Sequence, residues 1–136
     1  MKWTAKTRYA VAVLVLLAKA NGQTVPLVVI AQRLGLSKIY LEQVLSTLRS
    51  HHMVLAQKGP NGGYRLYGNP SVWSVLIATE PEWDTLPEPD FTDERMNSVL
   101  NELIYAPSRD HMRTRLSEQS ILTIAEHYAE SPMYYI

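Results

Sequence analysis

The sequence of 136 residues contains no cysteine. This absence excludes disulfide bonds, metal sites built on thiolates and cysteine nucleophiles. The apolar stretch at residues 9–18 is too short to cross a bilayer as a helix. With 46% apolar and 19% charged residues, the chain fits one modest globular domain that can bury its own core.

Acidic residues are almost missing from the first part of the chain. Residues 1–79 carry nine basic side chains and a single acid, Glu42, which gives a net charge of +8. Residues 80–136 carry four basic and twelve acidic side chains, a net charge of −8, so the whole chain is neutral. Such an asymmetry is typical of a polyanion-binding segment followed by a segment with another role. Nucleic acid is the first candidate partner, and the plain alternative is charge that only keeps two faces solvated.

The start of the chain imitates a secretory signal peptide. Basic residues precede the apolar stretch, and residues 18–20 have the small-x-small form of a cleavage site. The opposing interpretation is a helix capped by Thr4 or Thr7 that continues to Ala20 and ends at Asn21 and Gly22. The motifs further along favour this helix, and we therefore expect a cytoplasmic protein without membrane contact.

Two short helices joined by a tight turn are predicted between residues 26 and 50. Pro26 can open the first helix, whose apolar residues repeat at helical spacing until Gly35. Ser37 is a good cap for the second, which should run to about Ser50. The apolar stripe of the second helix consists of Leu41, Val44, Leu45 and Leu48. This pattern predicts a helix-turn-helix, whose second helix lies in the DNA major groove, although ordinary helical hairpins share it.

A hairpin is predicted directly after these helices. Residues 53–58 and 64–67 resemble strands, and the loop between them is rich in Asn and Gly, which tolerate tight hairpin turns. The predicted fold class is therefore mainly α with a small β-hairpin wing, a winged helix-turn-helix. A phosphate cradle is the alternative for the glycines, but the spacing differs and no Gly-Lys-Ser or Gly-Lys-Thr follows.

Five segments of the sequence together carry a family pattern. They are residues 2–10, 30–31, 37–45, 48–49 and 58–66. The most specific parts are the block Tyr40-Leu41-Glu42-Gln43 and the wing Gly59-x-x-Gly62-Gly63-Tyr64. At this separation they resemble the Rrf2 family of bacterial transcription regulators, and the resemblance covers residues 1 to about 80 well.

The resemblance implies a homodimer that binds a partly palindromic operator in double-stranded DNA, with a long carboxy-terminal helix crossing its partner. It divides the chain into a winged-helix domain (1–80), an acidic proline-rich loop (81–91) and a helical dimerisation and carboxy-terminal segment (92–136). The best-known members hold an iron–sulfur cluster on three cysteines in that loop, which this chain lacks. We therefore expect no cofactor, and control by a small molecule, a protein effector or abundance alone. Other departures are His52, where the family usually has glycine, and Lys58, where it usually has arginine.

The face of the second helix opposite its apolar stripe is predicted to read bases. A step of about 100° per residue points Ile39 and Gln43 outward, with Tyr40 and Glu42 on the flanks. Ile39 suits a thymine methyl group, Gln43 an adenine and Glu42 a cytosine amino group. The family's matching glutamate reads cytosine. The alternatives are a stray surface isoleucine and a weak intrahelical pair of Glu42 with Lys38.

Further DNA contacts are expected from basic residues around this helix. Lys6, Arg8 and Arg49 suit phosphates, which position the domain without reading sequence. Lys58 suits the minor groove or a phosphate. The full set of expected DNA-contacting residues is Lys6, Arg8, Ser37, Lys38, Ile39, Tyr40, Glu42, Gln43, Arg49, Lys58, Gly59, Asn61 and Gly62.

The second half of the chain is predicted to dimerise. Thr92 is expected to cap a helix that ends at Pro107, Ser108 to cap another, and apolar residues at 121–128 to mark the last helix. The stripe expected to form the dimer consists of Met96, Val99, Leu100, Leu103 and Ile104. The family resemblance favours burial against a partner chain, and packing against the first helix of the same chain is the alternative.

Neither a metal site nor a catalytic centre is predicted. His51 and His52 are adjacent, so on a helix they diverge and cannot easily hold one ion. Two functional hypotheses remain: a dimeric DNA-binding transcription regulator, expected to be a repressor, and a winged-helix module whose basic face docks an acidic protein or the chain's own acidic segment. An enzyme is the least favoured class.

Overall fold

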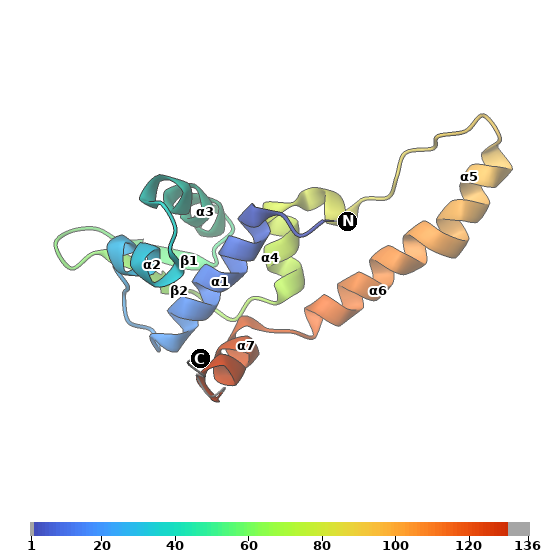
Figure 1. Cartoon of the computed structure of the whole chain (residues 1–136). Coiled ribbons are helices and arrows are strands. Elements are labelled where there is room, and N and C mark those ends of the chain that lie inside the picture. Colours follow the sequence, from blue (N-terminus) through green and yellow to red (C-terminus); the bar gives the residue numbers. More distant parts are fainter. Residues whose placement is uncertain (1, 131–136) are drawn as a thin grey trace, which may run out of the picture.

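The computed structural model describes residues 2–130. The first part contains α1 (Ala5–Lys19), α2 (Leu27–Leu34), α3 (Lys38–Ser50), β1 (Val54–Gln57), β2 (Gly63–Leu66) and α4 (Val72–Thr79). The second contains the 3-10 turn η1 (Pro81–Asp84), α5 (Glu94–Leu100), the π turn η2 (Asn101–Tyr105), α6 (Ala106–Ser117) and α7 (Ile121–Glu130). Figure 1 shows α5 and α6 as one rod beside a compact body that contains all other helices and the hairpin. The predicted fold class is confirmed.

Helix α1 is the central element of the main core. It begins at Thr4, whose side-chain oxygen accepts a hydrogen bond from the Thr7 amide (3.3 Å), so Thr4 rather than Thr7 is the cap. Its buried face packs against α2, α3, α4 and α7. The apolar stretch at residues 9–18 therefore lies inside a folded helix, as the second interpretation predicted. Within residues 2–130, no helix combines the length and apolar content needed to cross a membrane.

The predicted helix-turn-helix is present with the expected boundaries. Helix α2 follows Pro26 and ends at Gly35, which adopts the left-handed conformation (φ 67°) that glycine tolerates. Ser37 caps α3 by accepting a hydrogen bond from the Tyr40 amide (3.3 Å). The four residues of the predicted stripe on α3 are all buried. The stripe thus holds α3 against the core and leaves its opposite face to solvent.

The wing is attached to the helix-turn-helix through Val25, which lies two residues before α2. The Val25 amide donates to the Tyr64 carbonyl (2.8 Å), and the Tyr64 amide donates to the Val25 carbonyl (2.9 Å). A Cβ atom on the neighbouring Gly63 would lie 2.2 Å from the Val25 oxygen, so this contact requires glycine. The hairpin is therefore fixed relative to α2 rather than projecting as an independent arm.

The composition of the acidic loop predicts a surface segment, but the structure shows that the loop is partly buried at Trp83. Its first residues form η1, which places the indole of Trp83 in a second apolar cluster with Trp73 and Leu76. Met112 and Leu116 of α6 pack against this cluster. The loop begins as a structural connection between α4 and α6, and only its later part is exposed.

The long helix differs from the prediction at both ends. Asp93, not Thr92, caps α5 by accepting a hydrogen bond from the Met96 amide (3.1 Å). Pro107 does not end the helix, and Ser108 does not cap a new one, because the chain widens into the π turn η2 just before the proline. Pro107 then lies in the first turn of α6, where its missing amide hydrogen costs little. The result is one helical rod from Glu94 to Ser117.

Candidate nucleic-acid interface

The exposed face of α3 carries the predicted base-reading residues. Ile39 is 75% exposed, and Gln43 and Glu42 are also exposed. Tyr40 is half-buried because its ring packs edge-on against Tyr9 of α1, with 5.4 Å between ring centroids. The tyrosine therefore anchors the start of α3 to α1, while its three neighbours are presented to solvent.

Glu42 has no cation to neutralise it within residues 2–130. Its spacing from Lys38 allows an intrahelical ion pair, but within residues 2–130 no ion pair joins Glu42 to Lys38. The structural alternative for this carboxylate is therefore not realised. A lone exposed carboxylate on a basic surface remains available to accept a hydrogen bond from a base.

The wing and the end of α3 bring two expected phosphate contacts together. Arg49 and Lys58 are both exposed and line one hollow of about 320 Å³, together with Gly59 and Gly62. The Gly62 amide donates to the Gly59 carbonyl (2.9 Å), which closes the turn and leaves Asn61 exposed at its tip. Two cations beside exposed backbone suit a phosphate group.

Lys6 and Arg8, both in the first turn of α1, differ in their exposure and in their contacts. Arg8 is exposed, and its guanidinium lies 5.9 Å from the Tyr9 ring centroid, so it adjoins the Tyr9–Tyr40 contact to α3. Lys6 is half-buried, and among the described residues no hydrogen bond or ring contact joins it to α3. The structure therefore brings Arg8 to the α3 surface more directly than Lys6.

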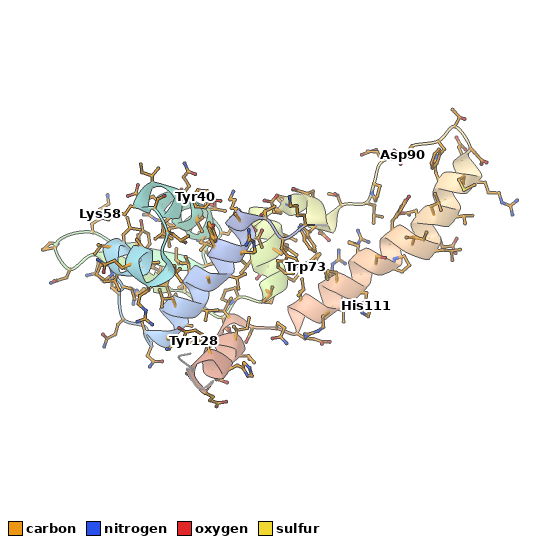
Figure 2. The ribbon with its side chains drawn as sticks, in the orientation of Figure 1. Tyr40, Lys58, Trp73, Asp90, His111 and Tyr128 are labelled. Carbon is orange, nitrogen blue, oxygen red and sulfur yellow. The ribbon has the colours of Figure 1, made fainter. Side chains whose placement is uncertain are left out.

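The basic surface and the acidic loop lie at opposite ends of the molecule. Figure 2 shows Tyr40 on α3 and Lys58 on the wing at one end, and Asp90 beyond η1 at the other. The charge asymmetry of the sequence is thus also a separation in space. An acidic loop at that distance does not cover the basic face in this conformation.

His52 is a feature that sequence reasoning noted but did not explain. It has a positive φ of 57° and turns the chain from α3 into β1. The turn is closed by hydrogen bonds from the His52 amide to the Arg49 carbonyl (3.0 Å) and from the Met53 amide to the Leu48 carbonyl (2.9 Å). A left-handed conformation is costly for a residue with a Cβ atom, which is the physical reason why glycine suits this position.

The predicted dimerisation stripe is exposed on the long helix. Leu103 is 70% exposed and Ile104 51%, while Met96 and Val99 are also exposed and Leu100 is half-buried. The alternative of packing against the first helix is wrong, because α7 and α4 occupy that surface of α1. Apart from the half-buried Leu100, the stripe therefore has no cover within residues 2–130.

A basic helix-turn-helix followed by an anchored hairpin defines the winged-helix class of DNA-binding proteins. Residues 3–127 match the Rrf2 family model, described as an iron-dependent transcriptional regulator. The chain belongs to the Rrf2 family of transcription regulators. Its relatives are regulators, not enzymes, in agreement with the sequence prediction.

Individual relatives extend this assignment. The chain is 46% identical over 89 residues to the HTH-type transcriptional regulator IscR of Sodalis glossinidius, which is 62% of this chain and 53% of that protein. The match thus spans about half the length of these curated relatives. Among solved structures, CymR, the global cysteine regulator of B. subtilis, is 25% identical with a TM-score of 0.75, covering 93% of this chain and 98% of that one. IscR of T. potens is 25% identical with a TM-score of 0.70, covering 99% and 95%.

The donor atoms of this chain do not fit the iron centre that the family description implies. Protein iron–sulfur clusters are held mainly by thiolates, and the chain has no cysteine. Within residues 2–130, no three histidine, aspartate or glutamate side chains gather in a group able to hold a metal ion. The described residues therefore offer no set of ligands for an iron centre.

Proposed function

We propose that the chain is a sequence-specific transcription repressor that acts as a cytoplasmic homodimer on a partly palindromic DNA operator, without an iron–sulfur cluster. The observation that carries this proposal is the exposed α3 face, where Ile39, Glu42 and Gln43 lie together between basic flanks. Family membership supports the DNA-binding role. The homodimer, the repressor role and the operator symmetry are inferences from the features described next.

Base reading falls to three chemically different side chains on α3. The methyl groups of Ile39 suit the methyl group of a thymine, and the Gln43 amide suits adenine. The Glu42 carboxylate accepts a hydrogen bond from a cytosine amino group. A carboxylate repels phosphates, so its place on a +8 segment is explained by a contact that only a base supplies.

Positioning on the duplex falls to the wing and to the ends of α1 and α3. Arg49 and Lys58 both contact one phosphate in the hollow that they line with Gly59 and Gly62. Arg8 contacts a second phosphate near the start of α3. These contacts raise affinity for any sequence and orient α3 in the groove. Wing-tip residues such as Asn61 then lie over the adjacent minor groove.

Dimerisation is assigned to the rod formed by α5, η2 and α6. Its 24 residues extend over about 36 Å, and Figure 1 shows that its α5 end lies far from the winged-helix body. A stripe of large exposed apolar side chains on such a rod is unfavourable in water. A second copy of the chain covers the stripe symmetrically and links two recognition helices, which a palindromic operator requires.

The repressor role is the simplest regulatory role that the architecture supports. We assign to the described residues only DNA contacts and a dimer surface, and a dimer that occupies an operator blocks access of other proteins to that DNA. The remaining candidate, docking of an acidic protein by the basic face, uses the same charges but predicts a different dependence on salt and sequence.

The test is a titration of the protein with labelled duplex DNA at several salt concentrations. Phosphate neutralisation makes log K fall with log salt by about 0.9 for each phosphate contacted. Lys58→Ala should weaken binding to all sequences and reduce the slope by about one unit. Lys19→Ala is the matched control, because Lys19 is the last residue of α1 and is not one of the expected DNA contacts. Its ammonium group lies over the Tyr128 ring, 4.4 Å from the ring centroid. Absence of DNA binding at low salt, or equal slopes for both variants, would contradict the proposal.

A further inference from the structure

A pocket of about 470 Å³ lies where the winged-helix body meets the long helix. One wall comes from the start of the chain and from η1, and the other from the end of η2 and the start of α6. Six residues define its chemistry: Lys2, Glu80, Glu82, Trp83, Tyr105 and Arg109. Its volume falls within the range of small-molecule binding sites, about 300 to 1,000 Å³.

The charged side chains of this pocket balance but do not neutralise one another. Lys2 and Arg109 contribute two cations, and Glu80 and Glu82 two carboxylates, yet within residues 2–130 no ion pair joins any of the four. Arg109 instead donates to Asp110 (3.0 Å) and to a backbone carbonyl in η1 (3.2 Å), which fixes its guanidinium in place.

The two carboxyl groups of the pocket each take part in hydrogen bonds. The Thr4 hydroxyl donates to Glu80 (2.9 Å). A hydrogen bond from the backbone and a second one involving the Glu80 side chain lower the pKa of Glu82. The pocket thus places the side chains of Glu80 and Glu82, the latter with a lowered pKa, beside the two cations Lys2 and Arg109.

The rest of the lining is aromatic and apolar. The indole of Trp83 is buried, with its ring 5.3 Å from that of Trp3, and it contributes to the wall together with Tyr105, Leu86 and Pro87. Rigid aromatic and proline side chains bind an apolar group at little cost in conformational entropy. The site thus combines both signs of charge with an apolar wall.

We propose that this pocket binds a free L-α-amino acid with a large apolar side chain. Glu80 and Glu82 receive its ammonium group, Arg109 and Lys2 its carboxylate, and Trp83 and Tyr105 its side chain. An organic anion would face the two glutamates of the pocket, and an organic cation would face Lys2 and Arg109. A zwitterion places a group of opposite charge against each of these two pairs. Charge-assisted hydrogen bonds to both ends make recognition specific for the whole amino acid.

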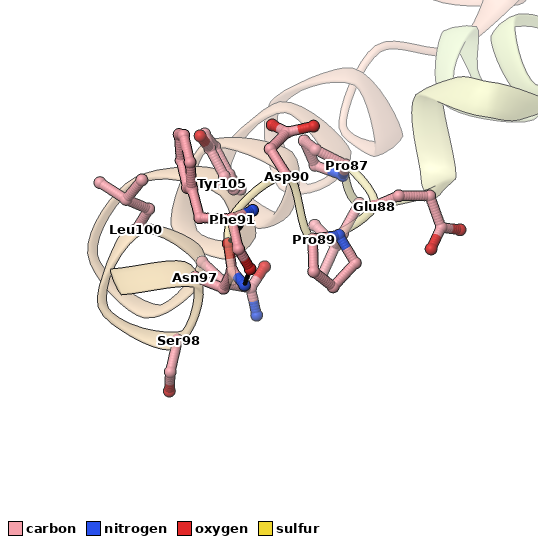
Figure 3. Close-up of a pocket in the computed structure, with 11 residues that line it drawn as sticks. Pro87, Glu88, Pro89, Asp90, Phe91, Asn97, Ser98, Leu100 and Tyr105 are labelled. Carbon is pink, nitrogen blue, oxygen red and sulfur yellow. Dashed lines mark hydrogen bonds between the residues drawn. The ribbon is translucent and has the colours of Figure 1, made fainter. Parts of the chain in front are cut away.

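The place of the pocket makes its occupant a regulator, and this step rests on the proposed function. Leu86, Pro87 and Tyr105 also line a second hollow of about 330 Å³ against α5. Figure 3 shows that hollow, where the Asn97 side chain forms two hydrogen bonds with the backbone of Phe91. A ligand therefore contacts the winged-helix body, the loop and the π turn of the dimerisation rod together. Its binding shifts the rod against the body and changes the spacing of the two recognition helices.

The binding test uses the full chain and three matched probes. Tryptophan fluorescence and calorimetry follow titration with L-phenylalanine, with phenethylamine, which lacks the carboxylate, and with 3-phenylpropanoate, which lacks the ammonium group. L-leucine and L-methionine extend the amino-acid set. We expect at least one amino acid to bind, and the amine and the acid to bind at least about tenfold more weakly than phenylalanine. Failure of all three amino acids to bind, or equal binding of the amine or the acid, would overturn the proposal.

A pair of isosteric variants tests the named residues. Glu82→Gln should weaken amino-acid binding at least about tenfold, while Glu88→Gln, whose side chain lines the neighbouring hollow and not this pocket, should leave it unchanged. Unchanged binding by Glu82→Gln contradicts the assignment. Operator binding is measured with and without the amino acid. Amino-acid binding without any DNA binding removes the proposed function and leaves the pocket, and DNA binding without amino-acid binding does the reverse.

Discussion

Val25 and Tyr64 exchange two backbone hydrogen bonds, 2.8 and 2.9 Å long, that fix the wing to the loop preceding α2. The pairing sets the angle between the wing and the helix-turn-helix, because Val25 forms an isolated antiparallel β-bridge with Tyr64 of β2. Both DNA-contacting elements of the proposed function therefore move as one unit. Loss of this pairing should weaken DNA binding even where every contacting side chain is present.

Gly63 is the position at which this pairing can be broken most directly. A Cβ atom there would lie 2.2 Å from the Val25 carbonyl oxygen, and its φ of 150° disfavours other residues. Gly63→Val should lower the free energy of unfolding by about 1 to 3 kcal/mol. Urea denaturation measures the change, with the exposed wing-tip variant Asn61→Ala as the control near zero. Equal stability of both variants would contradict the proposed close approach.

His52 should be improved by glycine. Its left-handed φ of 57° costs about 1 to 2 kcal/mol, which substitution by glycine would remove. The greater chain entropy of glycine in the unfolded state offsets part of this stabilisation. His52→Gly should therefore raise the free energy of unfolding by about 0.5 to 1 kcal/mol. The adjacent His51 has a φ of −99°, so His51→Gly should not stabilise the protein. Thermal melts of both variants decide the matter, and stabilisation by the second alone would refute the explanation.

Glu42 should determine sequence preference without supporting general affinity. Glu42→Ala removes the acceptor for a cytosine amino group, so discrimination at one base pair of each half-site should fall by about 1 to 3 kcal/mol. Binding to random DNA should stay equal or become tighter because a negative charge is removed from the DNA-facing surface. Competition binding with single-base operator variants measures this. Glu126→Ala on α7 is the control, and an unchanged preference in Glu42→Ala would remove the base-reading role.

Leu103 offers a sharp test of the dimer. It is 70% exposed in the single chain, so Leu103→Glu should fold normally but place two like charges into a symmetric interface. Sedimentation should show monomers, and affinity for a two-half-site operator should fall while binding to one half-site persists. Thr114→Glu, on the same rod outside the stripe, should remain dimeric. A Leu103→Glu protein that sediments as an unchanged dimer would place the interface elsewhere.

Iron should not influence this protein. With no cysteine in the chain, protein purified without air should be colourless, and iron depletion should leave its affinity for the operator unchanged. Visible absorbance accompanied by stoichiometric iron and sulfide would show that other donors hold a cluster.

The helix-turn-helix could be predicted from sequence because its boundaries depend on local chemistry. Pro26, Gly35 and Ser37 each act within one turn of the chain, and the structure shows the same start and stop positions. The exposed face of α3 follows from helical geometry once its stripe is buried. These features depend on neighbours a few residues apart, which a single sequence displays.

The long helix could not be predicted in the same way. A proline inside a helical pattern usually ends the helix. The π turn that accommodates Pro107 leaves no pattern in the sequence. Trp83 lies in an acidic stretch rich in proline, and the residues that bury it, Met112 and Leu116, are about thirty positions further along the chain. The pocket beside Trp83 escaped prediction for the same reason, since its walls meet only in the folded protein.

The measurement that tests the central claim most directly is the sequencing of genomic DNA fragments retained by the purified protein. The proposed dimer predicts one shared motif that is partly palindromic, with half-site centres separated by about one helical turn or a multiple of it. The same selection with Glu42→Ala should return a motif with one relaxed position in each half. Retention of fragments without a common motif, at a level that follows only their length, would contradict sequence-specific regulation.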